Sequence, residues 1–206
     1  MFFFYQIIIT TLILFSPIII IYRIVRKKED IKRFREKFSL PTKKRMKGNL
    51  IWFHGASVGE IMSIIPLIKH YENEKLINQI LITSSTLSSS KILKKFNFKK
   101  TTHQFYPVDQ YFFTKKFLNY WNPKIAIFIE SEIWPCMFKN LKFKKIPLIL
   151  LNGRITKKTF TKWKIFNKFS KSIFNKISVA YPQNNETQFF LKQFKLNKIK
   201  KIGNLK

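Results

Sequence analysis

The stretch IWFHGASVGE, residues 51–60, decides the fold of this chain. It begins as an apolar, strand-like run, continues through small residues and places Glu60 where a helix would start. This is the pattern of an open α/β sheet, whose functional groups lie at the carboxyl ends of the strands. Ser57 and Glu60 also fit the S-x-x-E capping box, in which both side chains bond to the backbone at a helix start. The residues alone therefore leave Glu60 open as a helix cap or as a reactive carboxylate.

A second acidic cluster follows another apolar run. Residues 124–129 (KIAIFI) are typical of a buried parallel strand, and Glu130 and Glu132 follow at its carboxyl end. Carboxylates at the end of a buried strand are costly unless they are paired or used, and the chain has only 10 acidic residues against 40 Lys and Arg. We interpret this cluster as part of a site. The alternative is that Ser131 or Glu132 caps the following helix.

Strand and helix patterns alternate from residue 50 onward. Predicted strands cover residues 50–54, 79–83, 125–129, 147–152 and 177–181. Predicted helices cover residues 58–71, 89–96, 110–120, 133–140, 156–174 and 186–194. The alternation predicts an α/β fold with a parallel sheet and right-handed crossovers, so that the loops carrying both acidic clusters converge on one edge.

The amino-terminal segment 2–22 carries no charged side chain. As a helix it would be roughly 32 Å long, enough to cross a bilayer. It has neither the basic start nor the small-residue cleavage site of a secretory signal peptide. Four basic residues follow between positions 23 and 28, so the positive-inside rule predicts a single-pass anchor in the inner membrane with the rest of the chain in the cytoplasm. Pro17 allows a kink in this helix.

Residues 23–48 form a basic juxtamembrane linker in this interpretation, with Arg33, Arg35 and Lys37 beside phenylalanines. Two roles stay open for it: contact with anionic headgroups, or an ordinary solvated linker. The net charge of +30 favours anionic partners, although the abundance of Lys, Asn, Ile and Phe points to compositional drift as one source of the charge. A single Cys136 excludes an internal disulfide, and three scattered His give no spacing typical of a structural metal site.

Six motifs together resemble the Kdo transferases, which attach 3-deoxy-D-manno-octulosonic acid (Kdo) to lipid A precursors. The stretch HGASVGE at 54–60 is similar to that family's H-x-x-S-V-G-E. The other five follow in the family's order: TSST at 83–86, YPVD at 106–109, ESEIWP at 130–135, NGR at 152–154 and GNLK at 203–206. The resemblance implies the amino-terminal half of a GT-B glycosyltransferase, with a Rossmann-like acceptor domain over residues 49–206. The carboxyl-terminal domain that holds the donor nucleotide is absent from this chain.

The resemblance also implies catalytic roles. Inverting transfer of Kdo from CMP-Kdo to lipid IVA needs one general base. Glu60 matches the family's general base, so the resemblance favours a catalytic role for Glu60 over a capping role. The resemblance implies no cofactor. We expect the helix start to lower the pKa of Glu60. Glu130 and Lys206 match the family's residues that stabilise the transition state. The alternative for Lys206 is a frayed terminal lysine among many.

Substrate contacts are implied for a further set of residues. Ser57 would act as a cap beside the acceptor, and Gly59 would let the lipid-linked sugar approach the backbone. Arg154 would grip a phosphate, with a surface salt bridge as its alternative. His54 fits a hydrogen-bonded structural histidine better than a proton shuttle. The polar run 83–90 would offer hydroxyl or N–H donors to the acceptor.

We therefore predict a membrane-anchored, cytoplasm-facing acceptor domain that is active only with the missing half. That half could be a separate subunit; a truncated product and an inactive remnant are the other origins of such a chain. The competing function is a non-enzymatic, membrane-tethered module that binds anions or RNA. RNA binding requires exposed aromatics among basic residues, whereas most phenylalanines here follow apolar patterns, so nucleic acid is not an expected partner.

Overall fold

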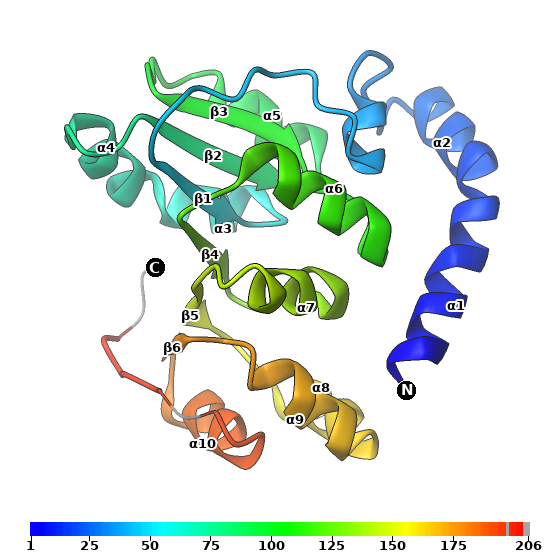
Figure 1. The fold of residues 1–206 in the computed structure, drawn as a ribbon, viewed down its shortest axis with the longest axis vertical. Coiled ribbons are helices and arrows are strands. Elements are labelled where there is room, and N and C mark those ends of the chain that lie inside the picture. Colours follow the sequence, from blue (N-terminus) through cyan, green and yellow to red (C-terminus); the bar gives the residue numbers. More distant parts are fainter. Residues whose placement is uncertain (197, 204–206) are drawn as a thin grey trace.

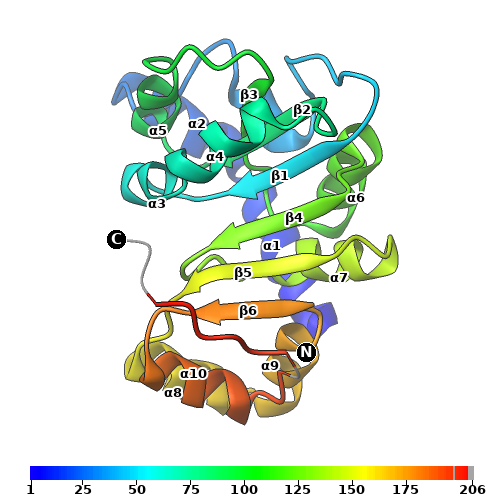
Figure 2. The same cartoon turned by 90° about the vertical axis from the view of Figure 1, so that its left-hand side faces the viewer.

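The protein is described by a computed structural model that covers residues 1–196 and 198–203. Its six strands form one parallel sheet in the order β3-β2-β1-β4-β5-β6 (Figure 2), as the alternating pattern predicts. The strands are β1 (Leu50–His54), β2 (Gln79–Ser84), β3 (Thr101–Phe105), β4 (Ile125–Ile129), β5 (Leu148–Gly153) and β6 (Val179–Pro182). The chain reverses its winding direction between β1 and β4. Ligands of open α/β sheets bind at this point, outside the carboxyl ends of the strands.

The helices lie on both faces of the sheet (Figure 1). They are α3 (Val58–Ser63), α4 (Ile65–Asn73), α5 (Leu87–Leu93), α6 (Tyr111–Trp121), α7 (Pro135–Phe143), α8 (Lys157–Ile165), α9 (Asn167–Phe174) and α10 (Asn185–Gln193). Two long helices of the sequence prediction are each divided in two. The first breaks at Ile64, because Pro66 has no N–H for the helix ladder. The second breaks at Phe166, whose ψ of 48° lies outside the helical range.

Side chains of each strand alternate between two apolar layers. Trp52 and Phe128 belong to the layer that also contains residues of α6, α7, α9 and α10. Phe53 and Ile127 belong to the other, which contains residues of α3, α4 and α5. All five residues of β1 are buried, as expected for an inner parallel strand covered on both faces.

Strand β3 is absent from the sequence prediction because its sequence TTHQF is polar. It pairs with β2 at the sheet edge and is covered by a short 3₁₀ helix, η1 (Phe34–Phe38). The Glu36 carboxylate in η1 accepts the Phe105 N–H at 2.7 Å. An edge strand can therefore be fixed by a side-chain acceptor, without an apolar pattern of its own.

The basic linker folds onto this edge. Arg33 donates to Glu36 from Nε and Nη2 at 2.9 and 3.0 Å, and its guanidinium lies 4.7 Å from the centre of the Phe105 ring. The Arg33 side chain is only 14% exposed and Glu36 is fully buried. Arg33 is therefore part of the folded domain and not of a solvated linker.

The amino-terminal segment forms two helices, α1 (Phe2–Leu14) and α2 (Ser16–Val25), which meet at a bend of 54° just before Pro17. Among the described residues no single helix is long and apolar enough to cross a membrane, but this bent pair satisfies the length and composition criteria together. The pair runs along one side of the domain (Figure 1). Tyr5 Oη donates to Asp109 Oδ2 at 2.8 Å, and Gln6 Oε1 accepts the Tyr111 N–H at 3.1 Å.

Candidate functional site

Glu60 lies in the first turn of α3, directly after β1 at the switch point of the sheet. Ser57 is the N-cap and accepts the Glu60 N–H at 3.3 Å, so the predicted cap is confirmed. Glu60 Oε1 accepts the Ser57 hydroxyl at 2.8 Å, and Oε2 accepts the Ala56 N–H at 2.8 Å. Each carboxylate oxygen therefore keeps a second lone pair for another donor. Capping and a chemical role are compatible in this geometry.

The pKa of Glu60 is raised, which corrects the expectation that the helix start would lower it. Partial burial is the largest cause, and the negative charges of Glu132 and Glu130 add to it. The bonds from Ser57 and Ala56 act in the opposite direction but do not prevail. A raised pKa makes Glu60 a stronger base than an ordinary glutamate.

Glu130 follows β4, and its backbone adopts a left-handed conformation with φ of 57°. This costs a non-glycine residue about 1–3 kcal/mol. Glu130 is held by its N–H, which bonds to Leu151 O at 3.0 Å, and by its carbonyl, which accepts the Arg154 N–H at 3.3 Å. Residues from β4 and β5 thus fix a strained turn that brings Glu130 near Glu60.

Glu132 is held by two ring N–H groups. Its Oε2 lies 3.0 Å from His54 Nε2 and 2.9 Å from Trp134 Nε1. His54 is fully buried, Tyr106 stacks on it at 3.9 Å between ring centres, and its Nδ1 lies 3.0 Å from Thr83 Oγ1. Because a carboxylate only accepts, His54 Nε2 carries a proton. His54 therefore positions Glu132, in agreement with the structural interpretation of this histidine.

Asp109 caps α7 from a distant part of the chain. Its two carboxylate oxygens accept the N–H groups of Cys136 and Met137 at 3.0 and 2.9 Å. The alternative that Ser131 or Glu132 caps this helix is wrong: Ser131 donates to Arg154 O, and Glu132 bonds His54 and Trp134. Asp109 is nevertheless buried, and burial raises its pKa.

We expect Asp109→Ala to lower the free energy of unfolding by about 2 kcal/mol, because it leaves two buried N–H groups and the Tyr5 hydroxyl without their acceptor. Urea unfolding of the full chain in detergent measures this. Asp109→Asn retains one acceptor oxygen and should lose about half as much. Equal stability of the alanine variant and the natural chain would contradict the capping role.

The glycines near Glu60 differ in what surrounds them. A Cβ at Gly55 would lie 3.1 Å from Glu60 Cβ, so Gly55 allows the turn from β1 to close onto α3. A Cβ at Gly59 would meet nothing within 4 Å. The space at Gly59 is open to an approaching ligand, whereas Gly55 has a packing role that the sequence analysis missed.

The remaining predicted residues are placed as follows. Arg154 is exposed beside Glu130 and forms no ion pair with the described residues, so the surface salt bridge that was its alternative role is not found among them. Thr83 is buried and bonds Trp52, and Thr86 caps α5, so part of the polar run 83–90 is used internally. Lys206 lies outside the described residues. No group of His, Cys, Asp and Glu in the described part of the chain has a metal-binding arrangement.

Comparison with known proteins gives the family. Residues 32–206 match the family model described as 3-deoxy-D-manno-octulosonic-acid transferase (kdotransferase). The chain belongs to this family.

Curated relatives of the Kdo transferase family extend well beyond this chain. A 3-deoxy-D-manno-octulosonic acid transferase of Rickettsia bellii is 36% identical over 189 residues, which are 92% of this chain and 45% of the relative. The Rickettsia typhi transferase is 44% identical over 63% of the chain and 28% of its own length. A probable mitochondrial transferase of Arabidopsis thaliana is 38% identical over 72% of the chain and 34% of its own length. The chain thus spans about half or less of each relative and corresponds to the family's amino-terminal domain.

Proposed function

We propose that this chain is the acceptor-binding half of a glycosyltransferase that moves Kdo from CMP-Kdo to a lipid A precursor, lipid IVA, with Glu60 as general base. The observation that carries the proposal is the convergence of Glu60, Glu130 and Glu132 at the switch point, where partial burial, together with the charges of the latter two, raises the pKa of Glu60. The test is Kdo transfer by the chain supplied with a carboxyl-terminal half, with Glu60 intact and replaced.

In the proposed step an acceptor hydroxyl attacks the anomeric carbon of Kdo. The new C–O bond forms as the bond from that carbon to the phosphate oxygen breaks, so CMP leaves with the electron pair. Glu60 takes the hydroxyl proton, and its open lone pairs permit a hydrogen bond to that hydroxyl. Glu130 would face the positive charge that develops on the sugar ring. Arg154, Lys206 and the open space at Gly59 are the proposed contacts for substrate phosphate or carboxylate and for the acceptor.

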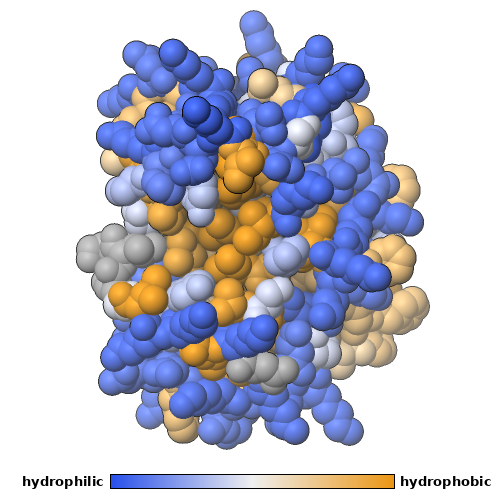
Figure 3. Space-filling model, turned by 60° about the vertical axis from the view of Figure 1, so that its left-hand side comes forward, coloured by the Kyte–Doolittle hydropathy of each residue, from blue (hydrophilic) through white to orange (hydrophobic). Residues whose placement is uncertain are grey.

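An uncovered region of the sheet supports the need for a second half. Figure 2 shows α3, α4 and α5 over β1 to β3, whereas β4 and β5 lie open toward the viewer. Ile125 on β4, Ile149 on β5 and Tyr181 on the neighbouring β6 are only partly buried. Figure 3 shows apolar side chains gathered in the middle of the surface on this side. Parallel sheets are normally covered on both faces, so a further part of the enzyme is suited to this surface.

We propose that α1 and α2 attach the protein to the inner membrane with the domain in the cytoplasm. Large apolar side chains on the outer face of the pair are exposed, among them Phe3, Phe4, Ile7, Ile8, Ile18 and Ile21. Inward-facing Tyr5 and Gln6 bond to the domain. If the two helices crossed the bilayer, Tyr5 would lie on its far side and could not bond Asp109. The described arrangement therefore favours helices that lie along the membrane surface, with the apolar side chains of their outer face in contact with lipid.

An alkaline phosphatase fused after Lys28 should be inactive, because the basic residues from Arg23 onward are expected to stay in the cytoplasm. Deleting residues 2–22 should move the protein from the membrane fraction to the supernatant. Phosphatase activity of the Lys28 fusion would contradict this orientation.

The fall of transfer activity at acidic pH should follow the protonation of Glu60. Transfer requires the ionised carboxylate, so the acidic limb of kcat/KM should lie at a higher pH than the pKa of an ordinary glutamate. Glu132→Gln removes a repelling charge, lowers the pKa of Glu60 and should move this limb to lower pH. The exposed Glu186 at the start of α10 gives a matched control, Glu186→Gln, that leaves the limb in place. A limb that stays fixed or rises in Glu132→Gln would count against the proposed coupling.

A further inference from the structure

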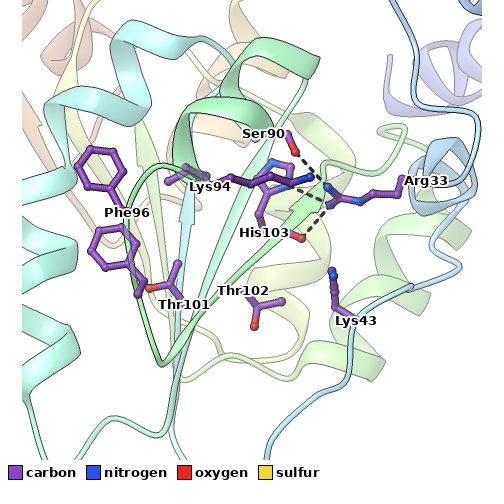
Figure 4. Close-up of a pocket in the computed structure, with 10 residues that line it drawn as sticks. Arg33, Lys43, Ser90, Lys94, Phe96, Thr101, Thr102 and His103 are labelled. Carbon is purple, nitrogen blue, oxygen red and sulfur yellow. Dashed lines mark hydrogen bonds between the residues drawn. The ribbon is translucent and has the colours of Figure 1, made fainter.

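A pocket lies at the β3 edge of the sheet. It has a volume of about 350 Å³ and is lined by residues of β3, of α5 and its following loop, and of the linker that covers them. Figure 4 shows Arg33, Ser90 and Lys94 close to His103, with Lys43 and the Thr102 side chain lower in the view. Its lining includes none of Ser57, Gly59, Glu60, Glu130, Glu132 and Arg154, and it shares only Ser90 with the polar run 83–90.

The pocket holds more positive charge than its surroundings neutralise. Glu36 pairs with Arg33, whose other N–H groups bond Ser90 Oγ at 3.0 Å and His103 O at 2.9 Å. The Nζ atoms of Lys43 and Lys94 form no hydrogen bond or ion pair with any residue that the structure describes; Lys43 bonds only through its carbonyl, which accepts the Tyr120 hydroxyl at 2.8 Å. Two ammonium groups thus remain uncompensated around one cavity.

His103 does not change this balance. Burial, together with the charges of Arg33, Lys43 and Lys94, lowers the pKa of His103 to about 3, so its ring is neutral. Arg33 Nη2 only donates, so His103 Nδ1 accepts from it at 2.9 Å, and the proton on Nε2 is donated to Ser84 Oγ at 2.8 Å. Both ring nitrogens are hydrogen-bonded, so the neutral ring is held in one orientation where it lines the pocket.

Like charges gathered around a partly enclosed cavity repel one another, and an anion relieves that repulsion. A phosphate monoester carries a charge of about −1.5 to −2 at pH 7, which matches two ammonium groups. Lysine binds phosphate as a point charge, and the Thr102 hydroxyl lines the same cavity. Leu93, Phe96 and Phe98 supply an apolar wall beside the cations.

We propose that this pocket is a second ligand site, which binds a phosphate monoester between Lys43 and Lys94 and packs the group it carries against Leu93, Phe96 and Phe98. Its ligand is either a soluble phosphate ester or a lipid whose headgroup is a phosphate monoester.

Calorimetric titration of the full chain in detergent tests the proposal with inorganic phosphate and phenyl phosphate as probes. Phenyl phosphate should bind several-fold more tightly than inorganic phosphate, because its ring reaches the apolar wall. The double variant Lys43→Gln/Lys94→Gln should bind phenyl phosphate at least about tenfold more weakly. The matched variant Lys47→Gln/Lys95→Gln has the same net charge and changes exposed lysines outside the pocket, so its affinity should stay within about twofold. Thermal unfolding of both variants checks that they are folded.

Vesicles distinguish the two sources of the ligand. Stronger binding to phosphatidic acid than to an equal charge of phosphatidylglycerol, lost in Lys43→Gln/Lys94→Gln alone, assigns a lipid headgroup. Binding of phenyl phosphate without this lipid preference assigns a soluble ester. Equal losses in the two double variants, or no saturable binding of either phenyl phosphate or phosphatidic acid, would overturn the site.

Discussion

Glu60→Gln is expected to lower Kdo transfer by about 10²- to 10⁴-fold when the chain is assayed with a carboxyl-terminal half. Glutamine keeps the size of the side chain and an oxygen that accepts the Ala56 N–H or the Ser57 hydroxyl, so the start of α3 is preserved. It takes no proton from the acceptor hydroxyl. The predicted defect is therefore in the chemical step and appears in kcat.

Ser57→Ala is the matched control for the capping role. It removes the acceptor for the Glu60 N–H and one donor to the Glu60 carboxylate, but it keeps the base. The loss of a cap costs about 1 kcal/mol of stability, and we expect a small change in transfer compared with Glu60→Gln. Near-normal turnover by a Glu60→Gln protein whose urea unfolding is unchanged would contradict the role of general base. Glu60 would then have only the capping role.

The fold follows from local patterns wherever the strands are apolar. Strands β1 and β4 begin and end where the sequence predicts, because inner parallel strands are continuous apolar runs. Strand β3 could not be found in this way, since its burial depends on Glu36 and Arg33 of a segment far away in the chain. The break at Ile64 was readable from Pro66, whereas the break at Phe166 has no such residue.

The sequence predicted which carboxylates form the candidate site, but not most of the contacts that they make. The carboxylates Glu60, Glu130 and Glu132 stand out in a basic chain at strand ends, and the structure brings them together. The pKa of Glu60 is raised mainly by burial and further by the charges of Glu132 and Glu130, and both depend on how the chain packs around β1 and β4. The helix start alone therefore gave the wrong direction for this pKa. The partners of Asp109 and His54 are likewise distant in sequence, so the YPVD motif gave no signal for helix capping or for stacking of Tyr106 on His54.

The amino-terminal helices show a similar limit. Hydropathy predicts one membrane helix, and the presence of Pro17 correctly predicts a bend in it. Hydropathy does not predict the hydrogen bonds of Tyr5 and Gln6, which place α1 beside the domain.

The central claim is that this chain supplies the acceptor half of a two-part transferase, and the most direct measurement compares Kdo transfer from CMP-Kdo with and without a second half. The carboxyl-terminal part of the Rickettsia bellii relative is suitable, because its amino-terminal part is 36% identical to this chain. Positioning of both reactants contributes up to about 7–11 kcal/mol in well-oriented systems. The chain alone should therefore bind the lipid A precursor and show no measurable transfer, and the added half should restore transfer. Turnover of CMP-Kdo by the chain alone, at a rate comparable with an intact relative, would contradict the account.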